Sequence, residues 1–464
     1  MSIVAPDPIV PGDAAEAAQA VPLRFVAPDQ PVPPTARTWA ERLGFDGQPG
    51  QILIVPGPEG GIDHVLVGTG PSFDPMSARA LSTRLPAGLY RLDADPAEAH
   101  AAGLAFLLGR YRFDRYKPSP DKGEVRLVAP EGFDAAEAGR IAAACALCRE
   151  MVDTPAADMG PLQMETIARE IAEAHGATIA VVTGNDLLEA NYPAIHAVGR
   201  AAAPHRAPRI IELGWNLDRT DRPLVALVGK GVAFDTGGLD IKPSAGMRNM
   251  KKDMGGAAHV LALARLVMQA DLDVRLVVLV AAVENAISAD AFRPGDVLSS
   301  RKGLTIEIGN TDAEGRLILA DALTRASEHA PDLTLDFATL TGAARVALGP
   351  DLPPLYTDDE ALADDLLRAA RAVRDPLWRM PLWPGYLAAI DSDLADVRND
   401  SAAWAQGGSI TAALFLQKFA PTTGAWGHLD VFAWNSRNRP GWPEGGEAQG
   451  LRAAYAMLKA RYAG

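Results

Sequence analysis

Three segments of the chain combine acidic and basic side chains with a high density of glycine: VGKGVAFDTGGLDIKP (228–243), MKKDMGGAAHV (250–260) and NTDAEGRLILADAL (310–323). Carboxylates that gather in one place repel each other and resist joint ionisation, and a pair of divalent cations relieves that repulsion. Such a pair also polarises a carbonyl and lowers the pKa of a shared water toward neutrality, and peptide hydrolysis needs both effects. The charged candidates are Lys230, Asp235, Lys242, Asp253, Asp312, Glu314, Arg316 and Asp321.

The residue types in these segments favour an oxygen-rich metal site. Carboxylate ligands suit manganese or magnesium, and zinc also accepts them. Taken singly, Asp235 or Asp253 is more often a turn or cap residue than a ligand, so spacing alone supports a metal site and plain turns about equally. Spacing also does not separate a peptidase from a two-metal phosphatase. Gly229-Lys230 lacks the flanking residues of a P-loop or of a dinucleotide fingerprint, which argues against phosphate-binding loops.

The charged segments lie near long apolar runs, and these runs predict buried strands. PLVALVGKG (223–231), VRLVVLVAAVEN (274–285) and LTLDFATLTG (333–342) are nearly continuous in apolar residues, as in strands covered on both faces of a mostly parallel sheet. Helix-like stretches at 257–269 and 316–330 lie between them. Ligands bind beyond the carboxyl ends of the strands in such sheets, which is where these charged residues would lie.

The length of 464 residues indicates more than one domain. The first half alternates short strand-like runs with helical stretches and ends in a long helical segment before Pro155. We predict a smaller N-terminal α/β domain over residues 1–155, ending in a connecting helix, and a larger catalytic α/β domain over residues 156–464 with a central, mostly parallel sheet flanked by helices. Cys145 and Cys148 are interpreted as small buried residues on that helix, because no second cysteine pair completes a zinc site.

Composition restricts the class of partner. A net charge of -14 argues against reading DNA through a basic face. The longest apolar stretch, at 274–283, is too short to span a bilayer and contains Arg275. The first twenty residues show no basic region followed by an apolar core. We therefore expect a cytoplasmic protein without membrane association, for which nucleic-acid binding is a minor alternative.

The segments resemble the leucyl aminopeptidase (cytosol aminopeptidase) family of two-metal peptidases. NTDAEGRL (310–317) looks like that family's signature, and GKGVAFDTGGLDIKP and KDMGGAA match its metal-binding stretches in order and spacing. YRFDRYK (111–117), DTPAADMGP (153–161), DFATLTGAARVALG (336–349) and GGSITAALFL (407–416) add support. The resemblance implies an aminopeptidase that hydrolyses the N-terminal residue, apolar and leucine-like, from short peptides by means of a water shared between two metal ions.

The resemblance also assigns metal and catalytic roles. Asp235 and Glu314 would bridge two divalent ions, manganese or zinc, while Lys230 and Asp253 complete the tighter site and Asp312 the looser one. Lys230 can ligate only when it is neutral. Lys242 would stabilise the tetrahedral oxyanion, and Arg316 would hold a bicarbonate ion as general base, since a guanidinium suits a planar bidentate anion.

Substrate residues and assembly follow from the same resemblance. One ion and Asp253 would hold the free α-amine of the peptide. Met250, Thr339 and Gly342 would line the side-chain pocket, and the carbonyl of Leu340 would orient the substrate. The family forms hexamers around an enclosed cavity, which predicts a homohexamer that admits short or unfolded peptides.

The sequence departs from the family pattern near its end. SRNRPGWPEGGEAQGLRAAYAML (436–458) is richer in charge, proline and tryptophan than the family's usual glycine-rich entry to the last helix, which puts the preference for leucine in doubt. Trp434 and Trp442 either narrow the pocket or serve as packing residues, and Asp153 stands where the family often has asparagine. Two other functions are alternatives: a DNA-binding or architectural protein, and a scaffold without activity. The acidic balance opposes the first, and the complete set of matching residues opposes the second.

Overall fold

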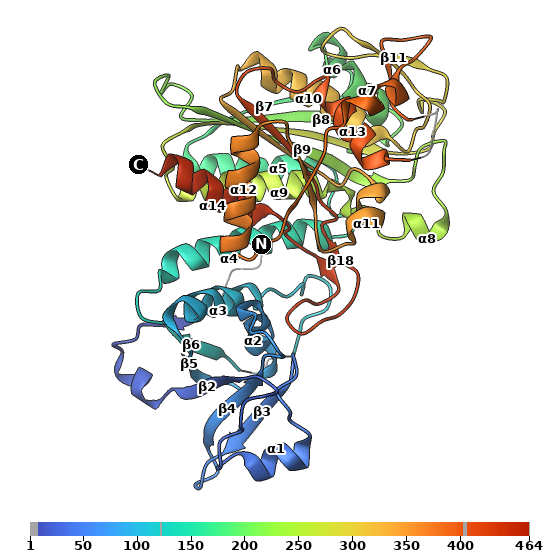
Figure 1. Cartoon of the computed structure of the whole chain (residues 1–464). Coiled ribbons are helices and arrows are strands. Elements are labelled where there is room, and N and C mark those ends of the chain that lie inside the picture. Colours follow the sequence, from blue (N-terminus) through green and yellow to red (C-terminus); the bar gives the residue numbers. More distant parts are fainter. Residues whose placement is uncertain (1–7, 121–122, 402–405, 464) are drawn as a thin grey trace. The chain divides into compact units, whose positions relative to one another are not determined.

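The computed structural model describes residues 8–120, 123–401 and 406–463. The chain forms two compact units, one of residues 1–146 with 437–444 and one of residues 147–436 with 445–464. Helix α4 (Ala135–Asp153) contains the point of division (Figure 1). The predicted two-domain α/β architecture is confirmed, whereas the predicted domain limits at residues 155 and 156 stay a prediction.

The first unit is built on a six-stranded sheet with the order β1-β6-β5-β2-β4-β3, in which only the edge pair β3–β4 is antiparallel. Its core includes the fully buried side chains of Leu23, Leu66, Tyr90 and Phe106. The strands are β1 (Ile9–Val10), β2 (Val21–Val26), β3 (Ile52–Pro56), β4 (Ile62–Gly68), β5 (Gly88–Asp93) and β6 (Val125–Val128). The helices are η1 (Ala15–Gln19), α1 (Arg37–Leu43), η2 (Pro75–Ala80), α2 (Leu81–Arg84) and α3 (Pro96–Leu108), with η marking 3-10 helices.

The second unit is built on an eight-stranded sheet with the order β15-β14-β17-β13-β9-β10-β8-β7. Its four central strands, β17, β13, β9 and β10, run parallel, and β8 and β7 extend it in antiparallel fashion on one side. The strands are β7 (Thr178–Thr183), β8 (Arg209–Trp215), β9 (Leu224–Asp235), β10 (Arg275–Asn285), β13 (Leu333–Ala338), β14 (Pro354–Tyr356), β15 (Trp378–Met380) and β17 (Ala425–Asp430).

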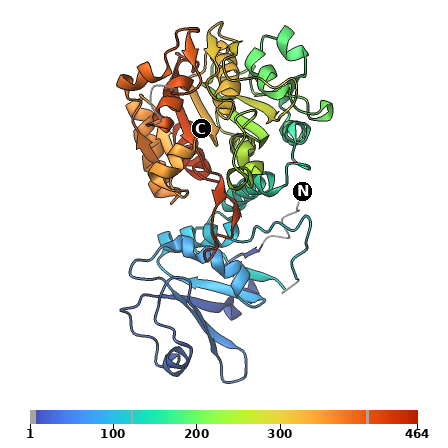
Figure 2. The ribbon, with the colours of Figure 1, turned by 90° about the vertical axis from the view of Figure 1, so that its right-hand side faces the viewer.

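Helices cover both faces of this sheet, as the sequence predicted (Figures 1 and 2). One face carries α5 (Pro161–His175), α9 (Gly255–Gln269), α12 (Glu360–Ala372) and α14 (Leu451–Tyr462). The other carries α7 (Pro193–Gly199), α10 (Glu314–Glu328) and α13 (Gly408–Gln417). Shorter elements are α6 (Asp186–Glu189), η3 (Pro204–Arg206), α8 (Ser244–Met247), η4 (Met250–Met254), α11 (Gly342–Leu348) and η5 (Pro384–Ile390).

Two small sheets lie outside the large one. The first joins β11 (Val297–Ser299), β12 (Thr305–Glu307) and β16 (Val397–Arg398), and the second joins β18 (Trp434–Asn435) to β19 (Gly445–Gly446). Strand β12 leads into the loop that precedes α10, and β16 runs parallel to it. These short strands therefore anchor the start of α10.

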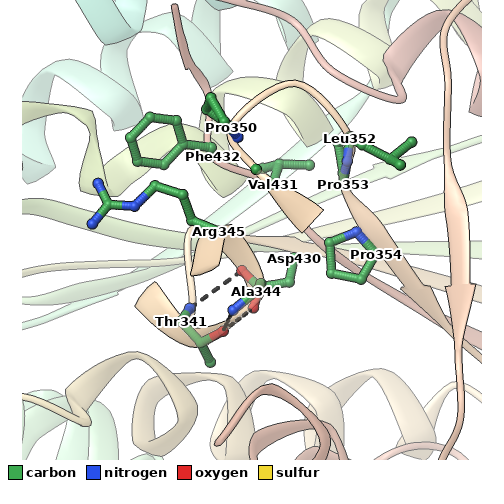
Figure 3. A pocket seen from close by; sticks show the side chains of 11 residues that line it. Thr341, Ala344, Arg345, Pro350, Leu352, Pro353, Pro354, Asp430, Val431 and Phe432 are labelled. Carbon is green, nitrogen blue, oxygen red and sulfur yellow. Dashed lines mark hydrogen bonds between the residues drawn. The ribbon is translucent and has the colours of Figure 1, made fainter. Parts of the chain in front are cut away.

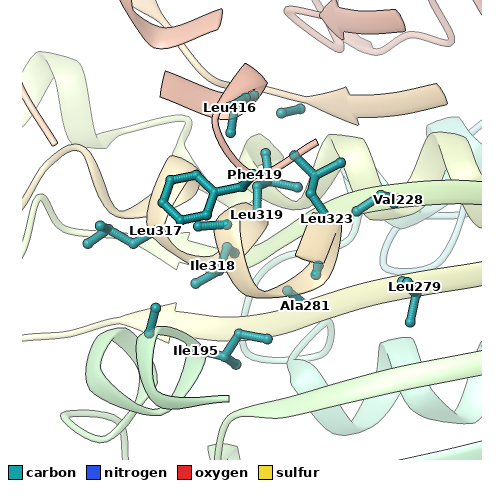
Figure 4. Close-up of a cluster of buried hydrophobic side chains, with 14 of the residues drawn as sticks. Ile195, Val228, Leu279, Ala281, Leu317, Ile318, Leu319, Leu323, Leu416 and Phe419 are labelled. Atoms are coloured by element: carbon teal, nitrogen blue, oxygen red, sulfur yellow. The ribbon is translucent and has the colours of Figure 1, made fainter. Parts of the chain in front are cut away.

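Helix α10 lies between the central strands and α13, within a large apolar cluster of the second unit (Figure 4). Burying each such leucine or isoleucine side chain contributes about 1.5–3 kcal/mol. The packing holds α10 rigidly, and with it the residues at its first turn. The labelled members are Ile195, Val228, Leu279, Ala281, Leu317, Ile318, Leu319, Leu323, Leu416 and Phe419.

Among the described residues, no helix is both long and apolar enough to cross a membrane. The two cysteines lie buried on α4, as the sequence predicted. The Cys148 Sγ atom lies 3.4 Å from Nδ1 of His259, which is itself fully buried on α9.

Candidate metal centre

Acidic side chains from three separate segments meet at the carboxyl end of β9. Asp235 is the last residue of β9, Asp312 lies in the loop before α10, and Glu314 is the first residue of α10. One carboxylate oxygen from each of these three residues lies within 4.8 Å of the other two. Asp253, in η4, joins the same group through Lys230. The structure thus brings together all five residues that the sequence predicted as metal ligands.

Two lysines lie among these carboxylates. The Nζ atom of Lys230 is 2.8 Å from Asp253 Oδ2 and 3.0 Å from Glu314 Oε1, and it donates to the Thr339 carbonyl at 2.8 Å. Lys242 Nζ is 2.8 Å from Asp235 Oδ2 and also contacts Asp312 Oδ1. Each ammonium group therefore bridges a pair of acids and offsets part of their charge.

The cluster still carries more negative charge than its burial favours. Burial and the neighbouring Asp235 raise the pKa of Glu314 to about 8. Burial and Asp235 also raise the pKa of Asp312 to about 6, although Lys242 acts in the opposite direction. These shifts have the cause predicted from sequence, because carboxylates held together in a low-dielectric site disfavour one another's ionisation.

The residues fit a divalent cation. The Oε2 atom of Glu314 is buried and has no hydrogen-bond partner among the described residues, while its side chain is only 2% exposed. The three converging carboxylates form the hard, oxygen-rich donor set that such ions prefer. Burial lowers the pKa of Lys230, but Asp253 and Glu314 outweigh it and raise that pKa above its usual value. Lys230 would therefore have to lose a proton to an entering cation before it could act as a ligand.

Asn285 is a functional candidate that the sequence analysis missed. Its Nδ2 donates to Asp235 Oδ1 at 2.8 Å and to the carbonyl of Thr311 at 3.1 Å. Asp235 Oδ1 also accepts the Gly237 N–H at 2.9 Å, which leaves Oδ2 directed to Lys242. The signal in the sequence was an asparagine at the end of a long apolar run. In the structure this asparagine ends β10 and pairs with Asp235 at the end of β9.

Glycine is required at two points of the cluster. Gly237 and Gly238 have φ angles of +87° and +64°, so the turn after Asp235 uses the left-handed region that glycine adopts without strain. At Gly315 a Cβ atom would lie 2.5 Å from Cε of Lys230. The lysine side chain therefore runs directly over the first turn of α10.

Arg316 and Asp321 both follow Glu314 on α10 but have different surroundings. Burial lowers the pKa of Arg316 to about 10, against the opposing effect of Glu314. Its Nε is buried without a hydrogen-bond partner among the described residues, which fits an anion ligand. Asp321, which the sequence analysis grouped with the charged candidates, is not part of the cluster. Its carboxylate accepts the backbone N–H groups of Ala194, Ile195 and Arg301 at 2.7–3.1 Å.

Of the predicted substrate residues, Thr339 contacts Asp253 directly and Met250 shares its helix. Thr339 Oγ1 donates to the Asp253 carboxylate at 2.8 Å and to its carbonyl oxygen at 3.0 Å. Met250 begins η4, which carries Asp253, and is partly buried. The Leu340 N–H donates to Asp430 Oδ1 at 2.9 Å. Gly342 begins α11 and is exposed, and a Cβ atom there would meet nothing within 4 Å.

Asp430 borders a small pocket next to this segment (Figure 3). Its carboxylate also accepts from the Thr341 hydroxyl at 2.7 Å and from the Thr341 N–H at 3.3 Å. The guanidinium of Arg345 lies 5.1 Å from the ring centre of Phe432 on the pocket wall. The full lining is Thr341, Ala344, Arg345, Gly349, Pro350, Leu352, Pro353, Pro354, Asp430, Val431 and Phe432.

Trp434, just before the divergent C-terminal segment, and Trp442 within it have separate environments. Trp434 is 7% exposed, and Lys251 Nζ lies 5.4 Å from its ring centre. Trp442 belongs to the first unit, where the guanidinium of Arg79 lies 4.7 Å from its ring centre. Trp442 therefore packs against Arg79 within the first unit.

Comparison with known proteins identifies relatives for both units. The family model described as "Cytosol aminopeptidase family, catalytic domain" matches residues 146–455, and "M17 aminopeptidase, N-terminal domain" matches residues 27–130. The probable cytosol aminopeptidase of Rhodococcus erythropolis is 36% identical over 444 residues, covering 90% of this chain and 87% of that protein. That of Roseiflexus castenholzii is 39% identical over 368 residues, covering 76% and 74%.

Solved structures are similar over almost the whole chain. The cytosol aminopeptidase from Coxiella burnetii superposes with a TM-score of 0.90 at 41% identity, covering 98% of this chain and 100% of that one. The bottromycin maturation enzyme BotP, in complex with Mn, superposes with a TM-score of 0.85 at 36% identity, covering 95% and 99%.

Proposed function

Because this chain belongs to the cytosol aminopeptidase family of hydrolases, we propose that it removes the N-terminal residue, preferably an apolar one, from short peptides with the help of two divalent metal ions. One observation carries the proposal: Asp235, Asp312 and Glu314 converge within 4.8 Å, and one oxygen of the buried Glu314 has no hydrogen-bond partner among the described residues. Such a site is costly to a fold unless a cation occupies it.

The five predicted ligands would divide between two ions. Asp235 and Glu314 would contact both, Lys230 and Asp253 would complete one site, and Asp312 would complete the other. Manganese or zinc would suit these donors, and manganese is the ion bound in the BotP structure. When bound, the ions would supply Lewis acidity toward the scissile carbonyl and toward the attacking water.

Lys242 would provide positive charge for the oxyanion that forms during peptide hydrolysis. Its side chain is 15% exposed, and it reaches the cluster beside Asp235 and Asp312. Burial lowers its pKa, but these two carboxylates outweigh burial and raise it, so the ammonium group stays charged at neutral pH. A fixed charge aimed at a developing oxyanion usually lowers the reaction barrier more than any other single interaction in an active site.

Arg316 would hold the general base. Its buried guanidinium lacks a hydrogen-bond partner at Nε among the described residues, and a bicarbonate ion would supply the planar anion that matches it. When bound there, this anion would supply the general base of the reaction, and Arg316 would hold and orient it.

Asp253 and the segment around Leu340 would orient the peptide. Asp253 is held by Thr339 Oγ1 and would receive the free α-amine, which explains a requirement for an unblocked N-terminus. The carbonyl of Leu340 would accept a hydrogen bond from the backbone of the substrate. Met250, Thr339 and Gly342 would surround the side chain of the substrate's N-terminal residue. Met250 is flexible enough to accept varied apolar groups.

Assembly and location are proposed from the family. A homohexamer would enclose the active sites and restrict substrates to short or unfolded peptides. The name that the relatives share, cytosol aminopeptidase, supports a cytoplasmic location. The net charge of -14 opposes a nucleic-acid partner.

A dipeptide panel run with manganese, zinc or a chelator tests this function. We expect turnover of leucine-like N-termini that a chelator abolishes and manganese restores. Glu314→Gln should lose nearly all turnover while its circular dichroism spectrum stays unchanged. Glu328→Gln is the matched control on the same helix, because Glu328 pairs with Arg301 at the distant end of α10, and it should keep full activity. Full activity of Glu314→Gln, or turnover in the chelator, would refute the proposal.

A further inference from the structure

Asn399 is a fully buried side chain that holds the loop between β12 and α10. It directly follows β16, and its backbone N–H donates to the Glu307 carbonyl at 3.0 Å. Its Oδ1 accepts the N–H groups of Gly309 at 2.9 Å and Asn310 at 3.3 Å. Its Nδ2 donates to the carbonyls of Asn310 at 2.7 Å and Ala313 at 3.4 Å. All four hydrogen bonds that the side-chain amide can make are therefore formed with this one loop.

The loop packs closely against its neighbours at Gly309. At Gly309 a Cβ atom would lie 2.0 Å from Oδ1 of Asp400, whose carboxylate accepts from Arg398 Nε at 3.0 Å. Within the loop, the Asp312 N–H donates to Asn310 Oδ1 at 2.8 Å. The backbone that presents Asp312 and Glu314 is thus tied to the end of β16.

Asn285 holds the same loop from the side of the large sheet. It is 1% exposed, and it joins the Thr311 carbonyl to the carboxylate of Asp235. The Thr311 N–H donates to Asp240 Oδ2 at 2.7 Å, and its hydroxyl donates to the Gly237 carbonyl at 2.6 Å. The loop before α10 is therefore linked to the turn after β9 on one side and to β16 on the other.

We propose that Asn285 and Asn399 are positioning residues that fix Asp312 and Glu314 against Asp235 before any cation binds, an inference that rests on the proposed metal-dependent function. Mutual repulsion drives these carboxylates apart, and the nearest way to relax is for the loop that carries two of them to move. Two neutral amides resist this movement without adding charge. Groups that orient metal ligands in this way set the affinity of the site although they do not touch the ion.

The side-chain type supports this role. At position 399 an aspartate would face two backbone carbonyls with no proton to donate, and at position 285 it would face the carboxylate of Asp235 with a like charge. At position 399 the amide supplies both a donor and an acceptor, and at position 285 its Nδ2 donates two hydrogen bonds without adding charge. The two residues are 114 positions apart in the sequence, yet both act on residues 309–313.

The test measures Mn2+ binding to the metal-free full-length chain by calorimetry, with thermal unfolding in chelator recorded alongside. We expect the substitutions Asn399→Asp and Asn285→Ser to raise the Kd of the more weakly bound Mn2+ ion by about 10–100-fold. We also expect part of the lost kcat/KM to return at high Mn2+ concentration. Asn399→Ala serves as a stronger variant if it folds.

Asp375→Asn is the control. Asp375 is 3% exposed and accepts three backbone N–H groups, from residues 450, 452 and 453, at the start of α14. Its replacement should lower the melting temperature and leave the Mn2+ Kd unchanged. Wild-type Mn2+ affinity in the asparagine variants, or an equal loss in Asp375→Asn, would overturn the positioning role. If the wild-type chain binds no Mn2+, the proposed function itself fails.

Discussion

Gly315→Ala should strongly reduce the activity of the enzyme without unfolding it. The new Cβ atom would lie 2.5 Å from Cε and 2.8 Å from Nζ of Lys230. Ordinary carbon contacts are ~3.5–4.0 Å, so the lysine must move by about 1 Å. Its Nζ now lies 2.8 Å from the Thr339 carbonyl and from Asp253 Oδ2, and a shift of that size takes such contacts beyond hydrogen-bond range.

The size of the effect follows from this displacement. Misplacing an active-site group by about 1 Å costs on the order of 10²-fold in rate, which corresponds to about 2.7 kcal/mol of barrier. In the opposite direction, alanine is favoured over glycine in a helix by at most about 1 kcal/mol, and this offsets part of the lost packing. We therefore expect kcat/KM to fall about 100-fold while the melting temperature changes by only a few degrees.

The assay is kcat/KM on a leucyl dipeptide at saturating Mn2+, with the melting temperature followed by circular dichroism. Gly139→Ala is the matched control: Gly139 also lies in a helix, α4, but a Cβ atom there meets nothing within 4 Å. It should gain about 0.5–1 kcal/mol of stability and keep full activity. If Gly315→Ala retained kcat/KM within about threefold of wild type, the assignment of Lys230 to the reactive cluster would be wrong.

Two further predictions concern stability. Burial alone raises the pKa of Glu212, but hydrogen bonds from His329 and Arg325 outweigh it and lower that pKa to about 2. A depressed carboxyl pKa stabilises the fold above the unfolded-state value near 4.5, so this contribution is lost as pH falls from about 4.5 toward 2. Urea unfolding should therefore show Glu212→Gln to be less stable by about 1–2 kcal/mol at pH 7, after allowance for solvent screening, with the gap closing near pH 3; a constant gap would contradict the pKa argument. Mn2+ at about 100 times its Kd should stabilise the metal-free chain by about 2.7 kcal/mol, seen as a rise in melting temperature that samples with chelator lack; no rise would argue against a metal site in the folded state.

Local patterns in the sequence were sufficient for three central strands and two helices of the catalytic unit. The apolar runs became β9, β10 and β13, and the two intervening helical stretches became α9 and α10. An apolar run buried on both faces carries its own signature, because every side chain along it must avoid water. The charged residues after these runs therefore indicated the edge of the sheet at which the carboxylates meet.

Contacts between distant segments were not readable from these patterns. Asp321 lies seven residues after Glu314 and looked like a member of the same group, yet it turns to the N–H groups of α7. Asn399 acts on Gly309 across 90 positions, and residues 437–444 leave the catalytic unit to join the first one.

The sequence by itself determined which residue types are candidates for the chemistry and which strands precede them, since periodicity and residue type are local properties of the chain. Only the tertiary structure decided which charges meet, that two lysines each bridge a pair of acids, and that two buried amides hold the loop before α10. The physical reason is that hydrogen bonds and ion pairs depend on distances of a few ångströms between segments, and no local pattern encodes those distances.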